Sequence, residues 1–450
     1  MKQIKIKKGL NIPIAGKPGL YPPESHEVTE TALLGQDYHG LKPGFSVKEG
    51  EKVKLGQELF IDKSCPNVSF TSPASGIVTA INRGEKRKFL SIIIKLDGEE
   101  TVSFKAFSEQ QLKTIAKRDV KQQLLASGQW TALRTRPFGK IPNPETEPHA
   151  IFINAMDTNP LAPDMQQVLA GRETDLSNGI HVLGALTSGK LFLCAGPSLK
   201  LPNITHPRLT HAVFSGPHPA GCAGTHIHFL NPVHLKRTVW YISAADTAAI
   251  GALFTTGRPD MQRIISLAGP SVITPRLLKT RIGASAGQLV SNHLHSGKNR
   301  IISGSVLSGR TASGAEAYLG RYHQQITALP EFSGYGAFSW LSPGTRLFSL
   351  KNIYLSRFMP RPVFDFTTAA HGSLRAIIPV ESYEKVMPLD ILPGYLLRAL
   401  AVDDIDEAEK LGCLELEEED LALCSFVCPS KIDHSVNLRK NLTLIEKECR

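Results

Sequence analysis

The stretch from residue 47 to residue 81 constrains the fold most, because apolar and polar residues alternate there between regularly placed glycines. Val47–Ile61 has glycines at positions 50 and 56, and Phe70–Ile81 continues the pattern around Pro73 and Gly76. Alternation with a period of two is typical of half-buried strands, and glycine suits the tight corners between them. Residues 40–105 are therefore predicted to form short strands separated by turns.

This pattern, Val-x-x-Gly-x-x-Val-x-x-Gly-Gln-x-Leu followed by Pro-x-Ser-Gly-x-Val, resembles the biotinyl/lipoyl-like barrel-sandwich domain. In carrier members of that family, a lysine at the hairpin tip between the two halves is modified, and Lys63 lies in this interval. Ten residues separate Lys63 from Pro73, and Ser64-Cys-Pro-Asn lacks the Met-Lys-Met or Asp-Lys-Ala setting. These departures favour an unmodified scaffold. A lipoyl- or biotinyl-type carrier protein that uses Lys63 is the alternative.

Residues 106–255 alternate between helical and strand patterns. Gln110–Ser127 has apolar residues at helical spacing, and a second helix is expected from about Asp164 to Ala170. Ala150–Asn154 and Leu191–Cys194 are continuous apolar runs of the kind found in buried strands. This alternation predicts a Rossmann-like α/β layer.

The rest of the chain returns to strands and then becomes helical. Arg263–Leu267 and Ile301–Gly304 are predicted strands, and residues 403–411 and 438–448 are predicted helices. A chain of 450 residues has room for several domains of ordinary size. The predicted fold class is α/β and α+β multidomain, with domains at residues 1–105, 106–255, 256–340 and 341–450.

Composition narrows the classes of function. The net charge of +10 is spread along the chain apart from Lys86–Lys88 and four lysines before residue 9, and no basic helix interleaved with aromatics occurs. Nucleic acid is therefore not an expected partner. Seven cysteines form no disulfide framework, which fits a reducing compartment. No apolar run approaches the ~20 residues of a membrane span, so we expect a soluble or peripheral protein without a transmembrane segment.

The Rossmann-like region lacks the glycine-rich loops that bind phosphates. No Gly-x-Gly-x-x-Gly follows its first strand, and no Gly-x4-Gly-Lys-Ser/Thr occurs in the chain. The segment before the strand at Ala150 instead contains Arg134, Arg136, Phe138 and Lys140. An arginine- and proline-rich loop cannot let its backbone approach a pyrophosphate as glycines can. Nucleotide or flavin binding is therefore not expected here.

Near the C-terminus the chain carries half of an iron–sulfur motif. A ferredoxin-type run is Cys-x2-Cys-x2-Cys-x3-Cys-Pro. Cys424 and Cys428 stand in its last two positions before Pro429, but Leu421 and Glu418 occupy the first two. A four-cysteine cluster cannot assemble at this run. We interpret the pair as vestigial, against the alternative of a chance Cys-x3-Cys in a helix.

Two further polar clusters are candidates for chemistry. His218, His226 and His228 lie in a glycine-rich phrase, and on a strand the last two would share a face. Three imidazoles can hold zinc, but they can equally bond to backbone groups of the turn or donate to a quinone carbonyl. No metal is the favoured interpretation. The acidic run from Glu415 to Asp420 is expected to face solvent on a helix.

The chain resembles the A subunit of the sodium-translocating NADH:quinone oxidoreductase essentially from end to end, and more distantly the Rnf complex C subunit and the flavin-bearing subunit of complex I. The order of domains is shared with the distant relatives, whereas the loss of the flavin loop and of two cluster cysteines is shared with the closer family. The segments that carry the closer resemblance are Ile6–Leu10 with Pro13–Gly16, Ser72–Gly76, Phe214–His228, Ser266–Pro270 with Pro275–Leu278, and Cys424–Lys431.

The resemblance implies a fold and a function. It implies a β-grasp domain of the soluble-ligand-binding type at 256–340 and a C-terminal helical domain at 341–450. It also implies a peripheral subunit on the cytoplasmic face of the bacterial inner membrane, in a complex that oxidises NADH, reduces ubiquinone and exports sodium. Flavins and iron–sulfur belong to other subunits, so no cofactor is expected in this chain and it is not expected to be catalytic alone.

The resemblance also suggests where a small-molecule site would lie. If one survives, the first choice is the emptied flavin pocket, lined by Arg134, Arg136, Phe138 and Lys140. The second choice is the turn that carries His218, His226 and His228. Both are quinone-proximal hypotheses, motivated by position in the sequence.

Overall fold

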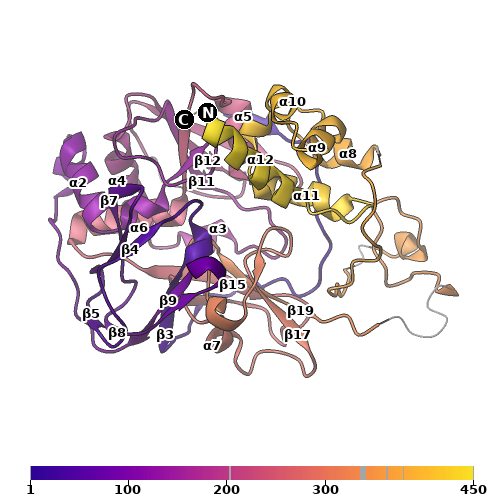
Figure 1. Cartoon of the computed structure of the whole chain (residues 1–450), viewed down its shortest axis with the longest axis horizontal. Helices are drawn as coiled ribbons and strands as arrows, with labels where there is room; N and C mark the ends of the chain where they lie inside the picture. The colour runs from indigo at the N-terminus through magenta and orange to yellow at the C-terminus, as the bar shows by residue number, and fades with distance from the viewer. Residues whose placement is uncertain (1, 202–203, 335–340, 361–362, 379, 449–450) are drawn as a thin grey trace.

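The computed structural model describes residues 2–201, 204–334, 341–360, 363–378 and 380–448. Its strands form four sheets, and helices α8 to α12 gather at the C-terminal end of the chain (Figure 1). Within the described ranges, no helix is both long enough and apolar enough to cross a membrane.

The N-terminal unit is a barrel-sandwich of two small antiparallel sheets, as its alternating pattern predicts. Phe60 and Phe70 stack across the strand pair β6–β7, with ring centroids 4.6 Å apart, and both are fully buried. The four-stranded sheet has the order β3 (Glu30–Leu34), β9 (Phe89–Leu96), β8 (Gly76–Arg83) and β5 (Lys52–Val53). The three-stranded sheet has the order β4 (Pro43–Phe45), β6 (Glu58–Asp62) and β7 (Cys65–Thr71).

The second unit is an α/β layer built on a mostly parallel six-stranded sheet. The predicted runs at Ala150 and Leu191 are confirmed as its two central strands, β11 and β12. The order is β1 (Lys2–Lys5), β13 (Leu209–Ser215), β12 (Lys190–Ala195), β11 (Ala150–Ala155), β14 (Val239–Ser243) and the antiparallel β10 (Arg134–Arg136). Its helices are α1 (Glu109–Leu112), α2 (Lys117–Ala126), α3 (Met165–Val168), α4 (Glu173–Gly184), α5 (Ala223–Leu230) and α6 (Ala244–Thr256).

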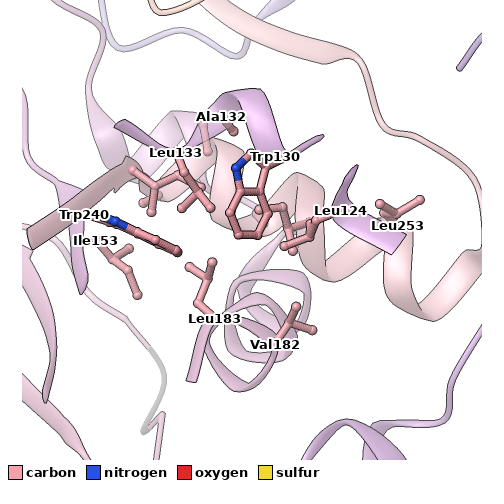
Figure 2. Close-up of a cluster of buried hydrophobic side chains, with 14 of the residues drawn as sticks. Leu124, Trp130, Ala132, Leu133, Ile153, Val182, Leu183, Trp240 and Leu253 are labelled. Atoms are coloured by element: carbon pink, nitrogen blue, oxygen red, sulfur yellow. The ribbon is translucent and has the colours of Figure 1, made fainter. Parts of the chain in front are cut away.

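One face of this sheet carries the largest core of the molecule. Trp130 and Trp240 meet edge to face with ring centroids 5.4 Å apart, and Leu183 of α4 and Ile153 of β11 lie beside them (Figure 2). The indole of Trp130 donates to the carbonyl of Pro142 at 2.8 Å. Burial of such large side chains stabilises the segment just before β10, because each contributes roughly 1.5–3 kcal/mol or more on leaving water.

The third unit is a mixed sheet. Its order is β18 (Arg310–Thr311), β17 (Asn299–Ser303), β19 (Gln325–Pro330), β15 (Gln262–Ala268), β16 (Arg276–Arg281) and β2 (Glu24–Ser25), with α7 (Ala286–Val290) against it. The first 105 residues, expected to form one N-terminal unit, thus contribute to three units. β1 pairs with β13, and β2 pairs with β16.

The C-terminal unit packs five helices around an apolar centre. Leu396, Leu421, Leu438 and Leu442 are fully buried there. The helices are α8 (Ser382–Val386), α9 (Pro393–Ala401), α10 (Ile405–Lys410), α11 (Glu418–Val427) and α12 (His434–Glu448). Before them, the described residues of 341–378 contain one short 3-10 turn at Leu355–Phe358 and follow an extended path away from the sheets (Figure 1).

Candidate functional site

The segment that carries Arg134, Arg136, Phe138 and Lys140 begins as the edge strand β10 and ends in a tight turn. Arg134 and Arg136 lie two apart on β10, so both side chains leave the same face. Phe138 and Gly139 have positive φ values of 78° and 62° and turn the chain back. The strand β14 holds β10 in register through the pair Arg134–Tyr241.

The acidic first turn of α11 lies directly against these two arginines. Arg136 donates to Asp420 Oδ2 at 2.7 Å, and its Nε lies 3.3 Å from Glu417 Oε1. Arg134 donates to Glu417 Oε2 at 3.0 Å, and the Tyr241 hydroxyl donates to the same oxygen at 2.6 Å. The expectation that the run Glu415–Asp420 faces solvent is therefore wrong for Glu417 and Asp420. Glu417 is 1% exposed and Asp420 4%.

The physical reason is that each buried charge has an opposite charge beside it. Burial raises the pKa of the Glu417 carboxyl, but the neighbouring charges of Arg134 and Arg136 outweigh burial and hold that pKa below its usual value. Glu417 and Asp420 also form the capping box of α11, which satisfies backbone N–H groups at the start of the helix. The paired cations and the capping bonds to backbone N–H groups offset part of the cost of burying these carboxylates.

Two glycines allow this close approach. A side chain at Gly139 would collide with the Glu417 carboxyl, and a side chain at Gly224 of α5 would collide with the Asp420 carboxyl. The close fit holds α11 at the edge strand of the α/β sheet and against α5 at the same time.

The histidine phrase folds as a turn followed by helix α5, not as the strand on which His226 and His228 would share a face. His226 and His228 lie on α5, where a spacing of two residues points side chains in nearly opposite directions. His226 Nε2 lies 2.9 Å from the carbonyl of Ala220, and His218 Nδ1 lies 3.2 Å from the Thr158 hydroxyl. Burial lowers the pKa of both imidazoles to about 4. Both rings are therefore neutral at pH 7.

His228 links the histidine phrase to the arginine-containing segment through Glu415. Its Nε2 accepts from the backbone N–H of Asp390, so its Nδ1 donates to Glu415 Oε2 at 2.8 Å. The carbonyl of the same Glu415 accepts from Arg136 at 2.8 Å. The structure thus brings Arg134, Arg136 and His228 around the start of α11, whereas His218 and His226 bond locally. Over the described ranges, no three His, Cys, Asp or Glu residues are grouped as a metal site.

Phe138 and Lys140 differ from the arginines, since they line an open hollow. The hollow has a volume of about 650 Å³ and is bordered by Pro148, His149 and Arg237. Lys140 Nζ bonds to Glu446 of α12 at 2.5 Å and also lines a second hollow of about 330 Å³, which Tyr38 and Leu41 border. This part of the predicted pocket is therefore accessible.

The two cysteines of the half-motif, Cys424 and Cys428, lie in the C-terminal core. Cys424 is inside α11, and Cys428 ends the helix and accepts a hydrogen bond from the Tyr383 hydroxyl at 3.1 Å. Burial raises the pKa of the Cys424 thiol to about 12. The two remaining motif positions serve the fold, because Leu421 is fully buried and Glu418 forms a bidentate pair with Arg439 at 2.6 and 2.7 Å.

Sequence reasoning missed Glu415, Glu417, Asp420 and Tyr241 as members of this cluster. The spacing of Glu417 and Asp420 is that of a capping box just before an apolar run, and it signals a helix start rather than a solvated helix face. Tyr241 gives no comparable signal, because it lies in an apolar strand.

The fold and the contacts between the β10 arginines and the α11 carboxylates define a class of protein. It is a multidomain α/β protein with a barrel-sandwich domain and a C-terminal helical unit that is held against the edge strand of its α/β sheet by buried ion pairs. Comparisons with known families are more specific. The NqrA N-terminal barrel-sandwich hybrid domain matches residues 4–97, the NqrA second alpha/beta domain matches 115–259, and the NQRA C-terminal domain, of SLBB type, matches 264–314.

Relatives match over the whole chain. The A subunit of the Na⁺-translocating NADH-quinone reductase is 52% identical in Hahella chejuensis, 49% in Cellvibrio japonicus and 50% in Haemophilus influenzae strain KW20. Each match covers 99% of this chain and 100% of the relative. The chain belongs to this family and is a subunit of Na⁺-translocating NADH-quinone reductase. Among solved structures, an NAD⁺-reducing [NiFe]-hydrogenase matches at 13% identity over 74% of this chain and 62% of that one, with a TM-score of 0.39.

Proposed function

We propose that this chain is a peripheral scaffold subunit without a redox cofactor, on the cytoplasmic face of the bacterial inner membrane, in a complex that oxidises NADH, reduces ubiquinone to ubiquinol and exports sodium. One observation carries the proposal. Arg134 and Arg136, the cations best placed to hold a flavin phosphate, are already neutralised by Glu417 and Asp420 of the same chain. An anionic cofactor would have to displace a buried, capped helix end.

Optical spectra test the cofactor part of this proposal. Flavin and iron–sulfur absorbance is expected in the complex captured through a tagged copy of the chain from mildly solubilised membranes, and none in the separately purified chain. Stoichiometric flavin in the isolated chain would refute a cofactor-free role. Recovery of the chain alone, without redox partners, would refute the role in the complex.

Of the seven residues predicted to lie near the quinone, we assign contact with the quinone to Phe138 and Lys140. An aromatic ring and an ammonium group on the wall of a 650 Å³ hollow suit a headgroup with an apolar ring and carbonyl acceptors. Lys140 pairs with Glu446, which also lines this hollow. Arg134, Arg136 and the three histidines are not among its lining residues and are proposed to position its wall. We expect Phe138→Ala with Lys140→Gln to raise the KM for ubiquinone several-fold in the assembled complex. Unchanged KM, equal to that of a control with Ile273→Ala and Lys298→Gln, would refute the assignment.

Contact with partner subunits is supported by exposed apolar side chains. Ile353 is 70% exposed, Phe358 71% and Leu374 76%, and all three lie among the described residues of 341–378. Such exposure is unusual for a protein that works alone and typical of an interaction surface. We propose that the described residues of this segment dock onto the membrane-bound part of the complex.

A carrier role for Lys63 is the second candidate, and the exposure of this lysine supports it. Lys63 lies in the turn between β6 and β7 and is exposed, as a modified lysine must be. Intact-mass measurement of the purified chain decides between the two. The scaffold role requires the mass of the unmodified sequence, and a lipoyl or biotinyl increment removed by Lys63→Arg would establish the carrier role.

A further inference from the structure

A third hollow, on the barrel-sandwich domain, is lined by five cationic side chains. Its volume is about 660 Å³. We call it the cationic hollow and define it by Lys42, Lys63, Arg83, Arg87 and Lys88. Lys42 precedes β4, Lys63 lies between β6 and β7, and the other three lie at or after the end of β8. Residues distant in sequence thus bring the same charge to one place.

These charges are not neutralised by the protein. All five residues are exposed, and among the residues whose structure is described they form no side-chain hydrogen bond and no ion pair. Arg83 alone has a side-chain partner, the ring of Phe45 at 5.2 Å. Asp62, which is next to Lys63 in the sequence, accepts instead from the backbone N–H groups of Lys42 and Ser64. No carboxylate borders the hollow within the described chain.

Elsewhere in the molecule, clustered arginines have carboxylate partners. Arg136 meets three carboxylates, and Arg263 and Arg321 share Asp246. Five like charges around one concavity repel one another and lower the stability of the fold, unless an anion from outside neutralises them. The turn that supplies Arg87 also holds two consecutive non-glycine residues at positive φ, Lys86 at 51° and Arg87 at 60°, a backbone conformation that costs free energy.

We propose that the cationic hollow binds a phosphate-bearing anion. Five positive charges exceed what one carboxylate neutralises, and arginine with lysine is the combination that proteins use for phosphate. The wall also includes Leu41 and Phe89, which offer apolar contact to the organic part of the ligand. An anionic phospholipid headgroup and a soluble phosphate ester share this chemistry. The hollow is separate from the 650 Å³ hollow at Phe138, so the inference does not depend on the quinone-side assignment.

The test compares wild-type chain with two triple variants of equal charge change. Lys42→Glu, Arg87→Glu and Lys88→Glu alter the hollow and leave Lys63 intact, so loss of a lysine modification cannot explain the result. Lys190→Glu, Lys200→Glu and Lys298→Glu alter exposed lysines outside it. Co-sedimentation is measured with vesicles of phosphatidylcholine alone and with about 30% phosphatidylglycerol, an anionic lipid that attracts clustered cations. Binding of inorganic pyrophosphate is measured by calorimetry, and polyglutamate is tested as a competitor.

We expect wild-type chain to bind at least one phosphate probe, and the hollow variant to bind it about 100-fold more weakly, near 5-fold per cation. The control variant should change by less than about 3-fold. Binding to phosphatidylglycerol vesicles alone identifies a lipid headgroup, and binding to pyrophosphate identifies a soluble ester. Equal loss in both triple variants, no binding to either probe, or binding of polyglutamate only would overturn the proposal. Lys42→Gln, Arg87→Gln and Lys88→Gln repeat the test if the glutamate variant does not fold.

Discussion

Arg136 and Asp420 are separated by 284 positions in the sequence, yet their side chains lie 2.7 Å apart in a fully buried contact. The contact joins the edge strand of the α/β sheet to the first turn of α11. Glu417 and Tyr241 extend it into a network in which every charged group has an opposite partner. The position of the C-terminal helices on the molecule therefore depends on this network.

Removal of Arg136 should be among the most damaging single changes in the chain. Arg136→Ala leaves Asp420 without its cation in a buried site and Glu417 with only Arg134, a loss that costs roughly 3–5 kcal/mol. Urea titration that follows the C-terminal helices measures it. Arg118→Ala, an exposed arginine on α2, is the control and should stay within about 0.5 kcal/mol. A cost below about 1 kcal/mol for Arg136→Ala would mean that the network does not hold α11 in place.

The Tyr241 hydroxyl can be tested without disturbing the packing. Tyr241→Phe removes the donor to Glu417 Oε2 and keeps the ring over which Arg134 and Arg136 lie. A hydrogen bond to a charged group contributes about 1.5–3 kcal/mol, so a destabilisation in that range is expected by urea titration. Tyr395→Phe, at a tyrosine that is 65% exposed, should have no measurable effect. Equal behaviour of the two variants would contradict the assigned role.

Stability should fall as pH falls from about 6.5 to about 4, in part because of His226. Burial lowers the folded-state pKa of this imidazole from 6.5 to about 4. Between those values the unfolded chain binds a proton that the folded chain does not, so unfolding becomes easier as pH falls. Above pH 6.5 this contribution to stability is fully present.

The variant His226→Gln lacks the imidazole that binds this proton in the unfolded chain, so it should lose that part of the pH dependence of stability. The slope of unfolding free energy against pH between 6.5 and 4 should then decrease by up to about 1.4 kcal/mol per pH unit. Urea titrations at pH 7, 6, 5 and 4.5 provide the slopes. His234→Gln, at an exposed histidine, should leave the slope unchanged. A His226→Gln slope identical to the wild-type slope would show that this ring titrates in the fold as it does in water.

Exposed apolar residues between 341 and 378 should matter for assembly and not for folding. Ile353→Asp with Phe358→Asp places charges where we propose that the membrane-bound subunits dock, and should reduce recovery of redox partners at least about 10-fold in pull-downs. The thermal midpoint of the isolated chain should stay within about 2 °C, because both side chains are about 70% exposed. Ile273→Asp is the matched control on the third unit. Full recovery of partners by the double variant would rule out this docking surface.

Local patterns were sufficient to predict several elements of secondary structure. The alternation in Val47–Ile61 and the apolar runs at Ala150 and Leu191 fold as predicted, because burial on one or both faces of a strand is encoded in neighbouring residues. Pairing partners far along the chain were not predictable in this way. No local feature of Lys2–Lys5 indicates that β1 pairs with β13 rather than with the barrel.

The sequence by itself determined the family, the barrel-sandwich pattern, the absence of a phosphate-binding glycine loop, and non-cysteine residues at two positions of the iron–sulfur motif, because each depends on residue identity and spacing. Only the tertiary structure decided that Glu417 and Asp420 are buried, that the arginines of β10 are already neutralised, and that five cations from separate turns share one hollow. The physical reason is that charge pairing acts through space. Whether Glu417 faces water or Arg134 depends on which distant elements pack together, and residue order along the chain does not record that.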